Sequence, residues 1–266
     1  MDRLDELEAQ SIYIIREARH HFRRLALLWS IGKDSTTLVW LCRKAFFGQL
    51  PFSVLHIDTG YKFGEIYQFR DKYAALWKLD LIVARNSEAV ARGRGPSGGK
   101  FECCTSLKTE ALKQAVAARR LEGLLLGIRR DEHGIRAKER HVSPRDRNFN
   151  WSYGDQPPEL WDHYRSNVSA ETHVRIHPLL HWTEKDVWRY IRRENIPFVR
   201  LYLAVDGRRY RSIGCEPCCS PVASRAVAVE DIIAELEVSR IGEREGRAQD
   251  KESAYTMQKL RALGYM

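Results

Sequence analysis

The residues with the clearest chemical potential are seven consecutive positions between an apolar run and a helical pattern. They are Ser30, Ile31, Gly32, Lys33, Asp34, Ser35 and Thr36. The small residues permit a tight turn whose backbone N–H groups converge, and the hydroxyls at the helix start add donors where the helix dipole favours an anion. Lys33 adds a positive charge for phosphate, and Asp34 is placed to hold Mg²⁺. The segment predicts a nucleotide-binding loop; an ordinary strand, turn and helix is the alternative.

The six cysteines form a second set with chemical potential. An adjacent pair occurs at Cys103–Cys104, and a Cys-x-x-Cys with one further cysteine occurs at Cys215–Cys219. In a chain without a secretory signal, cysteines are more typical of free, metal-bound or catalytic thiols than of disulfides. Cys42 lies in an apolar helical stretch, where core packing is expected.

Short buried strands alternate with helical patterns and would position both sets. We expect strands at Leu25–Trp29, Phe52–Ile57, Leu79–Val83, Leu124–Gly127 and Val174–His177. This alternation predicts a doubly wound α/β fold with a mostly parallel five-stranded sheet and ligands at the carboxyl ends of the strands. We expect one domain over 1–266, with its core at about 20–200 and a Cys-rich loop and helical C-terminal extension at about 205–266.

Composition excludes several classes of protein. The 266 residues are 44% hydrophobic and 30% charged, which is ordinary for a globular chain. No apolar run approaches the roughly 20 residues of a membrane helix, so we expect a cytoplasmic protein without membrane contact. The net charge of +9 suits a polyanionic partner, as does the Gly- and Arg-rich loop Arg92–Lys100. Residues 128–172 have little periodicity and predict an insertion over one sheet edge.

Five motifs give the chain a family resemblance. Ser-x-Gly-x-Asp-Ser after the first strand resembles the PP-loop of ATP pyrophosphatases, which cleave ATP between its α and β phosphates. Three further segments resemble the branch that holds the sulfate adenylyltransferase small subunit and the phosphoadenylylsulfate reductases. They are Leu55–Phe63, Gly127–Glu132 with Arg136–Arg140, and His177–Leu179 with Trp182–Trp188. Glu243–Arg247 resembles the C-terminus of the adenylyltransferase subunit.

The resemblance assigns roles to single residues. It implies that the loop residues bind ATP together with Asp58, Gly127, Arg129 and Arg130. Asp58 follows the second strand, where a ribose or a magnesium would lie. The guanidinium groups of Arg129 and Arg130 can clamp phosphate oxygens. The predicted catalytic residues are Lys33, Asp34, Ser35 and Arg130, with a surface ion pair as the alternative for Arg130 and Asp131.

The cysteine pattern resembles that of the assimilatory adenylylsulfate reductases. It implies that Cys103, Cys104, Cys215 and Cys218 hold a [4Fe–4S] cluster; zinc is the alternative metal, and free thiols a third interpretation. The reductases have a degenerate loop and a nucleophilic C-terminal cysteine, whereas this loop is intact and the chain ends in Leu263–Met266. Reductase activity is therefore not expected.

An intact ATP-cleaving loop together with this cysteine set is similar to the sulfur-inserting enzymes, above all the DndC and SspD components of DNA phosphorothioation systems. The implied function is adenylation of a DNA backbone phosphate for sulfur insertion, with release of pyrophosphate and AMP. The implied partners are ATP, DNA, a cysteine desulfurase and further phosphorothioation subunits. The main alternative is sulfate adenylyltransferase subunit 2, which would form adenylyl sulfate, require a GTPase partner subunit and need no iron. Thiolation of tRNA or a small molecule, and a non-catalytic nucleic-acid-binding sensor, are further alternatives.

Overall fold

A computed structural model describes residues 1–152, 154, 156, 159, 173–239, 242–244, 259–260 and 262–265. Its main sheet has the strand order β3-β2-β1-β4-β6-β5. The strands are β1 (Leu25–Leu28), β2 (Ser53–Ile57), β3 (Leu81–Ala84), β4 (Gly123–Leu125), β5 (Val142–Arg145) and β6 (His173–Ile176). All neighbouring strands run parallel except β5 and β6. The predicted α/β fold is confirmed, with six strands instead of five.

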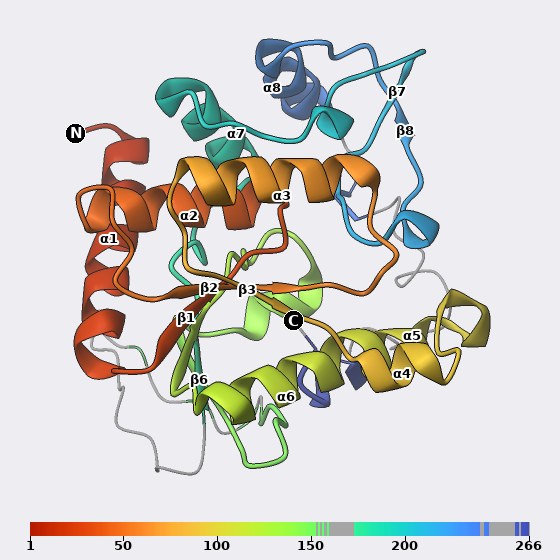
Figure 1. Cartoon of the computed structure of the whole chain (residues 1–266). Helices are drawn as coiled ribbons and strands as arrows, with labels where there is room; N and C mark the ends of the chain where they lie inside the picture. The colour runs from red at the N-terminus through yellow and green to blue at the C-terminus, as the bar shows by residue number, and fades with distance from the viewer. Residues whose placement is uncertain are drawn as a thin grey trace.

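Helices cover both faces of this sheet, with α1, α2, α3 and α7 on one face and α6 on the other (Figure 1). The α-helices are α1 (Arg3–His21), α2 (Lys33–Ala45), α3 (Gly64–Leu76), α4 (Ser87–Ala91), α5 (Lys100–Cys104), α6 (Glu110–Arg119), α7 (Glu184–Glu194) and α8 (Val229–Val238). A small antiparallel pair, β7 (Arg208–Arg209) and β8 (Val222–Ala223), lies outside the main sheet. Side chains that alternate along β1 therefore enter two different cores.

Strand β1 shows how the two cores form. Leu25 and Leu27 pack with the α1, α2 and α7 side, whereas Ala26 and Leu28 pack with the apolar residues of α6. All four side chains are buried. A parallel strand buried on both faces needs an uninterrupted apolar sequence, and this run of apolar residues allowed β1 to be predicted from the sequence.

The sixth strand was not predicted. Strand β5 lies within 128–172, where we expected only an insertion, and it pairs antiparallel with β6 at the sheet edge. Its sequence, Val-Ser-Pro-Arg, contains a proline and does not form an apolar run. An edge strand bonds on one side only, so proline is tolerated there and the sequence signal is weak.

The order of the strands places a topological switch between β1 and β4, because the chain passes from β1 to β2 and β3 on one side before β4 joins the other. Ligands of open α/β sheets bind in the crevice outside such a point. Among the described residues, no helix is long and apolar enough to cross a membrane. Beyond residue 239, most of the predicted helical C-terminal extension lies outside the described residues.

Candidate nucleotide site

The predicted nucleotide loop connects β1 to α2 at the switch point. Ile31 has a positive φ of 68°, an unusual conformation for a β-branched residue that a constrained turn must hold. Ser30 Oγ lies 3.0 Å from Ser35 Oγ, and the latter also donates to the Gly32 carbonyl at 3.1 Å. The loop is thus tied to the first turn of α2 by its own hydroxyls.

Two residues outside the loop fix its position. The backbone N–H of Lys33 donates to the Tyr202 hydroxyl at 2.9 Å. At the end of β4, a Cβ atom on Gly127 would lie 3.0 Å from both the Asp34 carbonyl carbon and the Ser35 nitrogen. Glycine at position 127 therefore permits the close approach of β4 to the start of α2.

The charged groups of the loop meet partners from distant parts of the chain. The buried Lys33 ammonium lies 3.2 Å from Asp34 and also pairs with Glu243, while Glu184 lies 4.0 Å away. The Arg129 guanidinium, fully buried, pairs with Asp34 and Glu243 and contacts Asp131 at 2.9 Å. Lys33 and Arg129 thus share two carboxylates.

The network fixes the charge state of its members. Burial alone would raise the pKa of Glu243, but the neighbouring Arg129 and Lys33 cations lower it to about 2. Burial opposes the charged form of Arg129, yet Glu243, Asp131 and Glu184 raise its pKa above the ordinary value. Both groups are therefore ionised at neutral pH.

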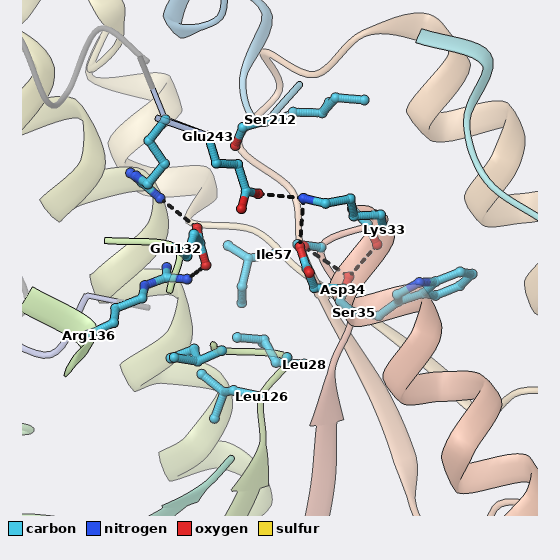
Figure 2. Close-up of a pocket in the computed structure, with 18 of the residues that line it drawn as sticks. Leu28, Lys33, Asp34, Ser35, Ile57, Leu126, Glu132, Arg136, Ser212 and Glu243 are labelled. Atoms are coloured by element: carbon cyan, nitrogen blue, oxygen red, sulfur yellow. Dashed lines mark hydrogen bonds and ion pairs between the residues drawn. The ribbon is translucent and has the colours of Figure 1, made fainter. Parts of the chain in front are cut away.

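A pocket of about 150 Å³ opens beside these groups. Its floor is apolar, since Leu28, Ile57 and Leu126 from the ends of three neighbouring strands lie there, while Lys33, Asp34 and Glu243 lie at one wall (Figure 2). Five basic and three acidic side chains occur among the described lining residues. An apolar floor within a lining that has more basic than acidic side chains suits an adenine ring attached to phosphates.

Segments from the C-terminal part of the chain complete the pocket. Arg244 contacts Glu132 at 3.0 Å, and the same carboxylate pairs with Arg136. Tyr265 also lines the pocket, and its hydroxyl lies 3.2 Å from the buried Lys108 ammonium. Lys108 lies in a short π-helix, Thr105–Thr109, an element frequent at functional sites.

The predicted loop residues lie together at the pocket, whereas Arg130 and Asp58 do not line it. Ser30, Gly32, Lys33, Asp34, Ser35 and Gly127 line the pocket. Ile31 and Thr36 are buried next to it, and Thr36 accepts from the Trp29 indole at 3.1 Å. Arg129 reaches Asp34 from behind the lining.

Arg130 and Asp58 are not among the described lining residues. The Arg130 guanidinium donates to the Glu139 carbonyl at 3.2 Å. Asp58 accepts from the Gly60 N–H and the Tyr67 hydroxyl, both at 2.8 Å. The switch lies between β1 and β4, whereas Asp58 follows β2. Contact of either residue with ATP stays a prediction.

The four predicted cluster ligands gather in one region. Cys103, Cys104, Cys215 and Cys218 are buried, and the pKa of Cys103 is raised to about 11 by burial and by the charges of the other three thiols. None of the six cysteines forms a disulfide. Cys42 is in the core as expected.

The arrangement of these thiols does not match a metal centre. Within the described part of the chain, no group of three or more His, Cys, Asp or Glu side chains is arranged to hold a metal ion. Cys215 Sγ instead lies 3.2 Å from the Thr59 hydroxyl. The [4Fe–4S] cluster and its zinc alternative therefore find no support in the geometry.

Magnesium is a different case, because it is commonly held by one or two carboxylates together with substrate phosphates. Asp34 lines the pocket and supplies such a carboxylate. Its oxygens now face Lys33 and Arg129, so a magnesium ion would compete with both cations for it.

Sequence reasoning missed several lining residues. Glu243 and Arg244 were noticed as part of a C-terminal motif but received no role, and Lys62, Lys108 and Tyr202 received none either. Tyr202 lies 169 residues from Lys33 along the chain and gave no sequence signal.

Comparisons with known proteins agree on one family. The profile of the phosphoadenosine phosphosulfate reductase domain matches residues 24–221. Sulfate adenylyltransferase subunit 2 of Rhodospirillum rubrum is 41% identical over 295 residues and is covered completely, as is this chain. The protein of the same name from Shigella dysenteriae is 41% identical over 98% of this chain and 97% of its own length.

Among solved structures, phosphoadenylyl-sulfate reductase from Candida auris has a TM-score of 0.55 at 18% identity, covering 84% of this chain and 98% of that one. At this identity the likeness concerns the fold alone.

These comparisons correct the predicted function. Full-length similarity to sulfate adenylyltransferase subunit 2 contradicts DNA phosphorothioation and favours the main alternative, so DNA and a cysteine desulfurase are not supported as partners. The prediction was wrong because it relied on the cysteine pattern, although Glu243–Arg247 already resembled the adenylyltransferase subunit. Two arginines of the loop expected to contact DNA also pair with carboxylates on either side of it, Arg92 with Glu88 and Arg94 with Glu102.

Proposed function

The chain belongs to the phosphoadenosine phosphosulfate reductase domain family, and we propose that it acts as a sulfate adenylyltransferase subunit 2, transferring the adenylyl group of ATP to sulfate. The observation that carries the proposal is 41% identity to proteins of that name over essentially the whole chain. The pocket at the switch point supports it, because its lining combines an apolar floor with basic side chains suited to phosphate.

The lining suggests how ATP would be oriented. Leu28, Ile57 and Leu126 offer an apolar surface for the adenine ring (Figure 2). Lys33 at the start of α2 would meet the phosphates, where the helix dipole adds to its charge. Arg129 would neutralise charge from the side, and Asp34 would hold Mg²⁺ bound to the phosphates.

The proposed reaction is a displacement at the α-phosphorus. A sulfate oxygen forms a bond to this phosphorus, the bond to the oxygen bridging to the β-phosphorus breaks, and pyrophosphate leaves with that electron pair. The protein has to stabilise negative charge that grows on the phosphoryl oxygens, and fixed cations in a water-poor pocket do this effectively. We assign this role to Lys33, which lines the pocket, and to Arg129, which is buried behind the lining and pairs with Asp34.

The experiment measures pyrophosphate release from Mg·ATP with and without sulfate. Because the relatives are named as a second subunit, the assay is run with the chain alone and with the partner subunit from the same organism. We expect release to require sulfate and the partner subunit. Release that does not change with sulfate in the complete assembly would contradict the proposal.

Two lysine variants locate the site. Lys33→Ala removes the cation at the loop, and we expect a loss of turnover of at least about a hundredfold, since one preorganised charge contributes on this scale. Lys72→Ala removes an exposed lysine from α3 and serves as the matched control, with unchanged turnover expected. Equal activity of both variants would remove Lys33 from the site.

A further inference from the structure

Glu243 lies where the phosphates of a nucleotide are expected. It belongs to the described segment Gly242–Arg244, yet its carboxylate enters the pocket and pairs with both Lys33 and Arg129. Figure 2 shows Glu243 and Lys33 directed toward one another across the pocket wall. One carboxylate oxygen faces each cation, so the anion uses both contacts that we assign to phosphate.

Burial makes it energetically unfavourable for Glu243 and a nucleotide phosphate to contact Lys33 at the same time. Glu243 and Lys33 are both buried, and charges interact more strongly in such surroundings than in water. A triphosphate beside Lys33 would bring several negative charges next to the Glu243 carboxylate. Arg129 and Lys33 are the groups that lower the pKa of Glu243, so a carboxylate that lost both cations to a triphosphate would lose the partners that stabilise its charge.

Neighbouring contacts hold the segment in place. Arg244 contacts Glu132 at 3.0 Å, and Arg136 pairs with the same carboxylate. These contacts do not involve Lys33 or Arg129, so the segment has a second attachment beside the pocket. Its Glu243 can therefore stay in the phosphate position while no nucleotide is bound.

We propose that Glu243 is a built-in competitor for nucleotide phosphates, which must give up Lys33 and Arg129 before a triphosphate can bind there, and which thereby sets the affinity of the site. This inference rests on the proposed function only in placing a nucleotide at Lys33; it does not depend on sulfate as the acceptor. A protein whose binding-competent state is a minor fraction has an apparent affinity reduced by that fraction. Removing the competitor should therefore tighten binding.

The test measures binding of the magnesium complex of a non-hydrolysable ATP analogue by titration calorimetry. Glu243→Gln keeps the size of the side chain and removes its charge, and we expect the dissociation constant to fall about tenfold. Glu237→Gln is the matched control, because Glu237 is an exposed residue of α8 paired with Arg189, and we expect no change. Weaker binding by Glu243→Gln would show that Glu243 assists the nucleotide and would overturn the proposal.

The unaltered protein provides a second measurement that does not depend on a variant folding. Arg244 is 7% exposed, so trypsin should cleave after it slowly. If the analogue displaces Glu243, cleavage after Arg244, identified by mass, should become faster at saturating analogue. Slower cleavage would mean that the nucleotide closes the segment onto the pocket, which contradicts displacement.

The outcomes separate this inference from the proposed function. Equal analogue affinity for wild type and Glu243→Gln would contradict the proposed role of Glu243 as a competitor, but it would not contradict the nucleotide site. Tighter binding by Glu243→Gln without any sulfate-dependent pyrophosphate release would support the role of Glu243 as a competitor and contradict the proposed adenylyltransferase activity. Absence of analogue binding to both proteins would overturn both.

Discussion

Gly127→Ala tests whether β4 and the start of α2 really touch at the nucleotide loop. The added Cβ would lie 3.0 Å from the Asp34 carbonyl carbon and the Ser35 nitrogen, and 3.1 Å from the Asp34 carbonyl oxygen. These are backbone atoms, which cannot rotate away as a flexible side chain can. Either the first turn of α2 or the end of β4 has to move by a few tenths of an ångström.

Overpacking of this kind typically costs about 1–3 kcal/mol of folding free energy. For a chain of this size, each kcal/mol lowers the melting temperature by about 2–4 °C. The larger effect should be on the nucleotide, because the displaced turn carries Lys33, Asp34 and Ser35. Positioning effects are steep, so we expect the affinity for the ATP analogue to fall about tenfold.

Gly64→Ala is the matched control. Gly64 opens α3, and a Cβ there would meet nothing within 4 Å. We expect this variant to be unchanged or more stable by about 0.4–1 kcal/mol, since alanine restricts the unfolded chain. Thermal unfolding and analogue titration are measured on both variants. Gly127→Ala with wild-type stability and affinity would refute the close approach at the loop.

Three further predictions concern a buried histidine of β2, the nucleotide loop and the cysteines. Burial lowers the pKa of His56 from 6.5 to about 4, so between these pH values the unfolded chain binds more protons than the folded chain, and the free energy of unfolding should fall as the pH drops. His56→Gln should flatten this pH dependence in urea unfolding, and an unchanged slope would contradict the prediction. Tyr202→Phe removes the acceptor of the Lys33 N–H and should cost about 1–3 kcal/mol of folding free energy, whereas an unchanged urea midpoint would show that the bond contributes nothing. Sulfate-dependent pyrophosphate release should survive anaerobic incubation with an iron chelator, because the described cysteines are not arranged around a metal; its loss would return Cys103, Cys104, Cys215 and Cys218 to the functional site.

The position of the predicted nucleotide loop could be recognised from the sequence because its features are local. Ser30 to Thr36 lie within one turn between β1 and α2, and their types and order are enough to indicate anion binding. The acceptor of the reaction was not predictable in this way. The motifs belong to ATP cleavage in general, and the cysteine pattern pointed to DNA phosphorothioation, which the full-length relatives contradict.

The sequence alone determined the α/β fold, the approximate positions of five strands and the position of the loop. Central strands such as β1 are buried on both faces and require continuous apolar runs, and the loop needs only neighbours in the chain. Tertiary structure decided which charges meet. Lys33 contacts Glu243 across 210 positions, and Tyr202 holds its backbone N–H across 169. It also separated Arg130 from Arg129, since adjacent residues in an irregular segment can point to different surroundings. Such pairings depend on how packed elements bring distant positions together, and no local periodicity records them.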